Sequence, residues 1–282
     1  MASPATLRYA AFTDDPRGGN PAGVVLASEL PPETEMQRIA AEVGFSETAF
    51  VAPSSGGADH DIRYFSPERE VVFCGHATIA TGVVLAERDP ELGEVLLATR
   101  TDLIPVAIRR DGHRIVATLT SPPTSHREAG DDLLAEVLGM FGWTRDDLDP
   151  RLPPAIAYGG ATHLVLPVAS RGTLAAMTYR FDDLKRVMLE QDWTTVAVVW
   201  RESDDRFHAR NPFPIGGVVE DPATGASAAA FGGYLRDAGL LAVPARLTIL
   251  QGEDMGRPSL IQVDVPADRP GIGVGGSAVA MP

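Results

Sequence analysis

The sequence predicts an α+β protein made of two similar halves, each a curled, strand-rich segment around one central helix. Short runs rich in β-branched residues, separated by Gly, Pro and Asp, indicate many strands. Two helical segments, 75–87 and 222–239, are small and apolar almost all round. A helix without a polar face should be surrounded by protein, and a sheet that wraps it would provide that burial.

The order of the elements suggests where the halves meet. An amphipathic helix is expected over 31–44, and a polar connection at 121–132 leads into the helical segment "LLAEVLGMFGW". We therefore expect a first half over 1–122, completed by a C-terminal strand at about 270–282, and a second half over 123–269. The expected strands are 7–12, 23–27, 47–52, 60–65, 94–99, 104–110, 114–120, 163–168, 195–200 and 245–252.

Composition narrows the range of partners. The 282 residues are 44% hydrophobic and 22% charged, with a net charge of −14. The negative charge and the lack of a basic block argue against nucleic acid and anionic membranes, so a small molecule is the expected partner. A single cysteine excludes an intrachain disulfide framework. The opening residues resemble no leader peptide and no run is long enough to span a membrane, so we expect a cytoplasmic protein.

The starts of the two apolar helices can be aligned with each other. Cys74-Gly75-His76 matches Thr224-Gly225-Ala226 at a separation of 150 residues (224 − 74). Glycine lets a ligand approach the backbone, and the first-turn N–H groups with the helix dipole attract an anion. Two such starts would form a carboxylate-binding cleft. The alternative is that these glycines only ease helix packing.

Three acid–base candidates lie near these positions. Glu47 stands where a loop enters an apolar strand and could take a proton from substrate, or it could be a solvated strand-end charge. Asp221 is another acid–base candidate. Because it precedes Pro222, it could instead be a helix N-cap with no part in the chemistry. His76, in the first turn of a buried helix, could donate to an anionic substrate or play a structural part.

Six sequence motifs lie between residues 18 and 280, in the order "GGNPAGVV", "AAEVGFSETAFV", "IRYFSPEREVVFCGHATIATG", "EDPATGASAAAFGGYL", "QGEDMGRPSLIQV" and "VGGSAVA". Together they resemble the PhzF-like family, named for the phenazine-biosynthesis isomerase. The motifs occur in family order, so the resemblance covers nearly the whole chain. It implies a diaminopimelate epimerase-like fold, similar also to proline racemase, with two pseudo-symmetric halves and the active site between them.

The resemblance implies proton transfer without a cofactor. It assigns Glu47 to move a proton between carbons of a dihydro-hydroxyanthranilate-like or amino-acid-like substrate, helped by His76 and Asp221. Developing negative charge would be stabilised by preorganised N–H donors in a dry site. A homodimer is also implied. The residues expected to bind the substrate carboxylate or its surroundings are Asn20, Gly75, His76, Thr224, Gly225, Ala226 and Ser227.

Cys74 is the only cysteine, and its role has several interpretations. Diaminopimelate epimerase resembles this chain but uses a cysteine at both helix starts, whereas here Cys74 is matched by Thr224, which excludes a two-cysteine racemase. Cys74 could be a lone nucleophile favoured by the helix N-terminus. A structural or substrate-lining role is the preferred interpretation. No metal is expected, because Cys74 and His76 lack a second ligand pair at zinc-type spacing.

One departure from the family affects the expected substrate. The phenazine enzymes place a serine directly after "EDPATG", where this chain has Ala226 and then Ser227. The leading hypothesis is an isomerase that moves a proton within a small carboxylate-bearing substrate. Two alternatives stay open: a catalytically silent small-molecule binding protein with the same cleft, and a thiol-dependent epimerase that uses Cys74.

Overall fold

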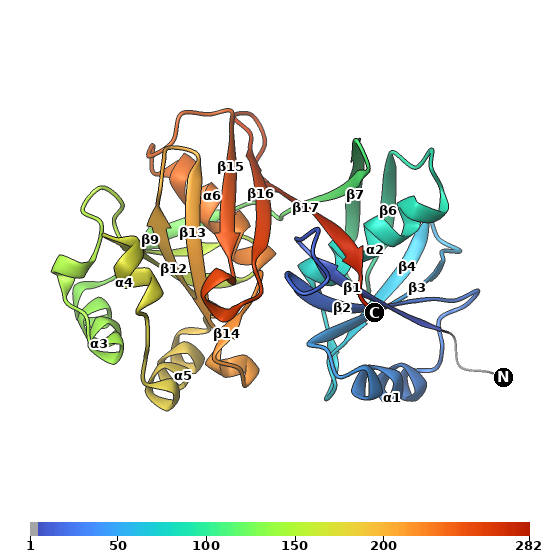
Figure 1. The fold of residues 1–282 in the computed structure, drawn as a ribbon, viewed down its shortest axis with the longest axis horizontal. Coiled ribbons are helices and arrows are strands. Elements are labelled where there is room, and N and C mark those ends of the chain that lie inside the picture. The colour runs from blue at the N-terminus through green and yellow to red at the C-terminus, as the bar shows by residue number, and fades with distance from the viewer. Residues whose placement is uncertain (1–4) are drawn as a thin grey trace. The chain divides into compact units, whose positions relative to one another are not determined.

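A computed structural model describes residues 5–282, which form two compact units (Figure 1). Unit 1 comprises the chain up to Thr120 together with 275–282, and unit 2 comprises 121–274. Residues 1–4 of the expected first half lie outside the described residues. The α-helices are α1 (Glu33–Val43), α2 (Gly75–Arg88), α3 (Asp131–Phe141), α4 (Arg171–Ala175), α5 (Phe181–Gln191) and α6 (Gly225–Asp237).

The strands of unit 1 form a closed ring. Their pairing runs β1–β2–β3–β4–β6–β7–β8–β17 and returns to β1, so the C-terminal strand joins the first strand to the eighth. Two-residue β5 adds to β4. The strands are β1 (Thr6–Ala11), β2 (Asn20–Leu26), β3 (Glu47–Pro53), β4 (His60–Phe65), β5 (Glu70–Val71), β6 (Glu94–Ala98), β7 (Leu103–Asp111), β8 (Arg114–Thr120) and β17 (Gly273–Ala280).

Helix α2 lies inside this ring. It contacts β1, β2, β3, β7 and β8, and all its residues from His76 to Ala86 are buried. A Cβ at Gly82 would lie 3.0 Å from Ala117 and 3.1 Å from Val106, so any larger residue would require these neighbouring side chains to shift. The all-round apolar composition of the segment is therefore explained by burial on every side.

Unit 2 repeats the plan with a curled sheet. Its pairing runs β9–β10–β11–β12–β13–β15–β16, with β14 added to β13. Helix α6 contacts β9, β10 and β11 at one end of this order and β16 at the other. The strands are β9 (Ser125–Glu128), β10 (Ala155–Tyr158), β11 (Thr162–Val168), β12 (Thr195–Arg201), β13 (Arg206–Pro212), β14 (Glu220–Asp221), β15 (Ala245–Gln251) and β16 (Ser259–Val265).

The expected α+β architecture of two similar halves, each a curled sheet around a central helix, is confirmed. Parallel pairs occur at matching places: β2–β3 in unit 1, connected through α1, and β11–β12 in unit 2, connected through α4 and α5. Apolar side chains of α1 and α5 pack against these strands. Within residues 5–282, no helix is both long enough and apolar enough to cross a membrane.

Candidate active site

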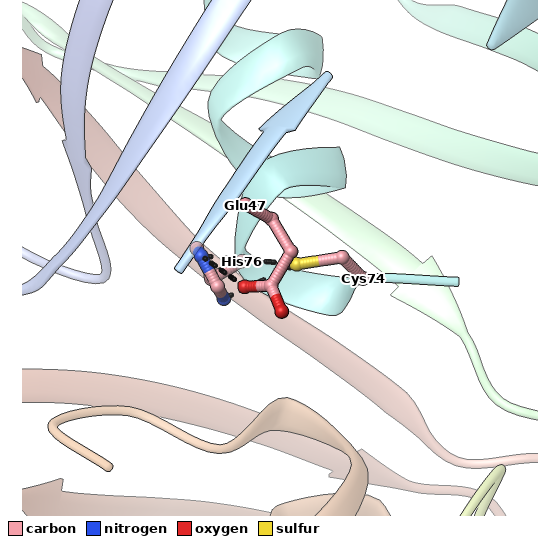
Figure 2. A group of neighbouring side chains, drawn as sticks. All are labelled: Glu47, Cys74 and His76. Atoms are coloured by element: carbon pink, nitrogen blue, oxygen red, sulfur yellow. Dashed lines mark hydrogen bonds and ion pairs between the residues drawn. The ribbon is translucent and has the colours of Figure 1, made fainter. Parts of the chain in front are cut away.

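Glu47 and His76 come together in unit 1 (Figure 2). Glu47 is the first residue of β3, and its side chain is 21% exposed. His76 is the second residue of α2 and is buried. Glu47 Oε2 lies 3.4 Å from His76 Nε2, and Ser46 Oγ lies 3.4 Å from the same nitrogen. The pair places a solvent-accessible carboxylate beside a buried imidazole, an arrangement suited to proton transfer.

Cys74 joins the same group. Its Sγ lies 3.3 Å from His76 Nδ1 and 3.7 Å from Nε2, and Figure 2 shows the three side chains converging. Cys74 occupies the N-cap of α2 with extended backbone. The sequence pattern could show that Cys74 and His76 are two residues apart, but not that the thiol would contact the imidazole.

The start of α2 is anchored from within the ring. The Cys74 carbonyl accepts hydrogen bonds from the Thr78 backbone N–H at 3.0 Å and from Thr78 Oγ1 at 2.7 Å. Thr78 Oγ1 also lies 2.6 Å from the hydroxyl oxygen of fully buried Tyr64. Burial raises the pKa of Tyr64, so its hydroxyl stays protonated. Hydrogen bonds between neutral groups therefore hold the start of α2 in place.

The first turn of α2 has the geometry expected of an anion site. The N–H groups of its first turn, from Gly75 onward, have no carbonyl within the helix as hydrogen-bond acceptor. A Cβ built on Gly75 would meet only the Phe73 ring, at 3.9 Å, so the backbone here is open to a ligand. The helix dipole favours a carboxylate at this point.

The structure corrects the interpretation of Asp221 as a helix N-cap. Helix α6 begins at Gly225, and Thr224 is its N-cap residue. Asp221 instead lies on β14 opposite Asn211, and its Oδ2 accepts a 2.5 Å hydrogen bond from Thr224 Oγ1. Three residues, Pro222, Ala223 and Thr224, therefore separate Asp221 from the first residue of the helix. Pro222 does not occupy the first helical turn.

Gln251, the last residue of β15, holds this turn in place. Its side chain donates to the Asp221 carbonyl at 2.7 Å and contacts Thr224 Oγ1 at 3.0 Å. Its Oε1 accepts from the Thr224 backbone N–H at 3.1 Å. Gln251 is buried, with 2% of its surface exposed. The "QGEDMG" motif was part of the family resemblance, but sequence reasoning gave Gln251 no role, since its partners lie about 30 residues earlier.

Replacing Gln251 with alanine is expected to lower the stability of unit 2 by about 1–3 kcal/mol, because Thr224 and Asp221 lose their buried partner. Urea denaturation followed by tryptophan fluorescence measures this, since all three tryptophans, Trp143, Trp193 and Trp200, belong to unit 2. The control is Gln262→Ala on neighbouring β16, a partly exposed site. Equal free energies of unfolding for the two variants would contradict the role of Gln251 in holding the turn before α6.

One ion pair in each unit holds the short strand that precedes the buried helix, β5 before α2 and β14 before α6. In unit 1, Arg63 on β4 donates to both carboxylate oxygens of Glu70 on β5 at 2.6 Å, which holds the pKa of Glu70 below its usual range. In unit 2, Arg210 on β13 pairs in the same way with Glu220 on β14, and this hydrogen bonding raises the pKa of Arg210. Sequence analysis missed both pairs.

The other expected binding residues lie at these same helix starts or beside them. Asn20 begins β2 and is buried opposite Ala11. Gly225 and Ser227 are buried in the first turn of α6, whereas Ala226 is partly exposed. The serine hydroxyl at 227 thus lies on the buried side of the helix and does not take the place of a hydroxyl at 226. The structure groups Glu47, Cys74 and His76 in unit 1 and Asp221, Thr224 and Gln251 in unit 2.

Comparisons with known proteins give the family. Residues 9–282 match the family described as "Phenazine biosynthesis-like protein". The Bacillus subtilis protein named "Uncharacterized isomerase YfhB" is 32% identical over 92% of this chain and 89% of its own length. Trans-2,3-dihydro-3-hydroxyanthranilate isomerase of Pseudomonas fluorescens is 32% identical over 89% of this chain and 86% of its own length.

A solved structure agrees with these relatives. The PhzF-family phenazine biosynthesis protein of Bacillus anthracis is 28% identical, with a TM-score of 0.88 over 100% of this chain and 98% of its own. This likeness confirms the diaminopimelate epimerase-like fold expected from the sequence. The matched relatives are named as isomerases, and the match extends over nearly all of the chain. The chain therefore belongs to the phenazine biosynthesis-like (PhzF) family of isomerases.

Proposed function

We propose that this isomerase moves a proton within a small carboxylate-bearing substrate and needs no cofactor for that step. The observation that carries the proposal is the pairing of a partly exposed Glu47 carboxylate with the buried His76 imidazole, 3.4 Å apart, at the start of an enclosed helix. A base, a neighbouring hydrogen-bonding group and a row of N–H donors are what a proton transfer at carbon requires.

In the proposed reaction, the Glu47 carboxylate takes a proton from a carbon next to a conjugated system. The substrate then carries delocalised negative charge, which the N–H groups at the start of α2 and the His76 imidazole stabilise. The protonated Glu47, whose carboxylic proton exchanges with solvent, then gives a proton to a different carbon, so the enzyme ends unchanged in charge. The family resemblance assigns Asp221 a part in steering this proton, and that assignment stays a prediction.

A dihydro-hydroxyanthranilate or an amino-acid-like carboxylate is the proposed class of substrate. It is supported by the Pseudomonas fluorescens relative, which is named for trans-2,3-dihydro-3-hydroxyanthranilate. The open backbone at Gly75 supports a carboxylate as the anchoring group. Ala226, where the family has a serine, removes a hydroxyl contact, so preference among these substrates is expected to differ from that of the relative.

The test is incorporation of solvent deuterium into substrate. Purified protein is incubated in D₂O with a panel of cyclic and amino-acid-like carboxylates, and the products are followed by NMR and mass spectrometry. Deuterium at the acceptor carbon supports the proposal. If several panel members bind in calorimetry and none exchanges, the proposal fails and a catalytically silent binding protein becomes the better description.

The contact of Cys74 Sγ with His76 Nδ1 at 3.3 Å favours one competing candidate, a thiol-dependent epimerase. Our proposal predicts that Cys74→Ser retains most of the turnover, because a carboxylate base needs no thiolate. Turnover is measured with the substrate found in the D₂O panel, and circular dichroism checks the fold. A loss of several orders of magnitude with the fold intact would establish the thiol mechanism instead.

Three further sequence-based expectations remain part of this proposal. The chain acts in the cytoplasm, forms a homodimer and has no nucleic-acid partner. The net charge of −14 supports the last of these, since nucleic acids attract basic surfaces. Sedimentation of the purified chain at several concentrations measures the oligomeric state.

A further inference from the structure

The three side chains that meet at the start of α2 also form a set of metal ligands. Within residues 5–282, one ligand atom each from Glu47, Cys74 and His76 lies within 4.8 Å of the other two. His76 Nε2 is 3.4 Å from Glu47 Oε2 and 3.7 Å from Cys74 Sγ. The same imidazole nitrogen therefore has both a carboxylate and a sulfur as close neighbours (Figure 2).

The separation between Glu47 and His76 matches an edge of a tetrahedral zinc site. Zinc bonds of about 2.3 Å to sulfur and about 2.0–2.2 Å to nitrogen or oxygen place neighbouring ligands about 3.3–3.6 Å apart. The 3.4 Å between Glu47 Oε2 and His76 Nε2 lies in this range. Cys74 Sγ lies 3.3 Å from Nδ1 and 3.7 Å from Nε2, over the face of the imidazole, so the sulfur reaches an ion bound to Nε2 only after a change of side-chain rotamer at Cys74 or His76.

The donor types select the ion. One sulfur, one imidazole nitrogen and one carboxylate oxygen suit Zn²⁺, whereas Mg²⁺ and Ca²⁺ prefer shells made of oxygen. Cys74 and His76 are buried, and the Glu47 side chain is 21% exposed, so an ion can enter from the Glu47 side. Three protein ligands leave a fourth position for water.

We propose that Glu47, Cys74 and His76 bind Zn²⁺ and that the bound ion inhibits the enzyme. The Cys74 thiol releases its proton to solvent when its sulfur binds the metal. The ion then occupies the Glu47 carboxylate and the His76 imidazole together, so neither can act on substrate. Inhibition rests on the proposed function, whereas metal binding by these three residues does not.

The binding test uses Co²⁺ as a spectroscopic substitute for Zn²⁺. Chelator-treated protein is titrated with Co²⁺ alone, and the near-ultraviolet thiolate-to-cobalt band and the visible bands of tetrahedral cobalt are recorded. We expect both sets of bands and their loss when Zn²⁺ is added. Cys74→Ser should remove the near-ultraviolet band, and His76→Gln and Glu47→Gln should each weaken binding roughly tenfold or more.

The chain offers a matched control in unit 2. His208 lies 2.6 Å from Glu253 Oε2 and 3.2 Å from Glu202 Oε2, a histidine between two carboxylates without a thiol. His208→Gln should leave the cobalt spectrum unchanged, and Mg²⁺ should not compete. Absence of the near-ultraviolet band, or its survival in Cys74→Ser with the fold preserved by circular dichroism, would overturn the proposal.

A separate measurement tests inhibition. Zn²⁺ is added to the deuterium-exchange reaction at concentrations that saturate the cobalt-defined site, and we expect exchange to stop and to return with chelator. Undiminished exchange at saturation would overturn the inhibitory role. If cobalt binds as described but no carboxylate exchanges deuterium even without metal, the metal site stands and the proposed function fails.

Discussion

Glu47→Gln is expected to lower turnover by roughly 10²-fold or more while leaving substrate binding in place. The amide keeps the shape of the side chain and its contact with His76, but it cannot take a proton from carbon. The measurement is deuterium exchange from solvent, followed for wild type and variant side by side, with calorimetry for binding.

Two comparisons make this result interpretable. Glu42→Gln changes an exposed glutamate that pairs with Arg38 on α1, and it should leave turnover unaffected. His76→Ala and Asp221→Ala should each cost less than Glu47→Gln if these residues only orient the substrate and steer the proton. Exchange by the Glu47→Gln variant at the wild-type rate would rule out Glu47 as the base.

Glu220→Ala is expected to reduce the free energy of unfolding of unit 2 by about 3 kcal/mol or more. The Arg210 and Glu220 side chains are only 10% and 8% exposed, so removing the carboxylate leaves a guanidinium charge buried without its counterion. Arg210 would keep its hydrogen bonds to the Leu174 and Ala175 carbonyls, which offset only part of the loss. Urea denaturation followed by tryptophan fluorescence measures the change.

The control for this prediction is an exposed pair in the same unit. Arg246 and Asp264 pair across β15 and β16 with side chains 64% and 46% exposed. Asp264→Asn should change stability by less than about 1 kcal/mol, because solvent screens the pair. A Glu220→Ala variant no less stable than Asp264→Asn would show that the Arg210 pair contributes little. Arg210→Met combined with Glu220→Leu should recover part of the loss, since it removes both charges.

Local patterns in the sequence were sufficient to predict the fold class and many of its elements. The helix expected over 31–44 is present as Glu33–Val43, and the strand expected over 60–65 is present with those bounds. Both depend on the spacing of apolar side chains along one element, which the sequence displays directly. Helix α5 and the seven-residue strands β13 and β16 were not among the expected elements. The two-residue strands β5 and β14 were missed because two residues held in a strand by an ion pair carry no periodicity.

For the site, the sequence by itself determined the identities of Glu47, His76 and Asp221 as candidates, through the family motifs, and the all-round apolar character of α2 and α6. Only the tertiary structure decided that the Cys74 thiol touches His76, that Asp221 lies on a strand and is not a helix cap, and that Gln251 holds it. The reason is physical: periodicity records which face of an element is buried, whereas these contacts join residues on different elements. Their geometry is set by how the sheet curls around each helix, which no single segment encodes.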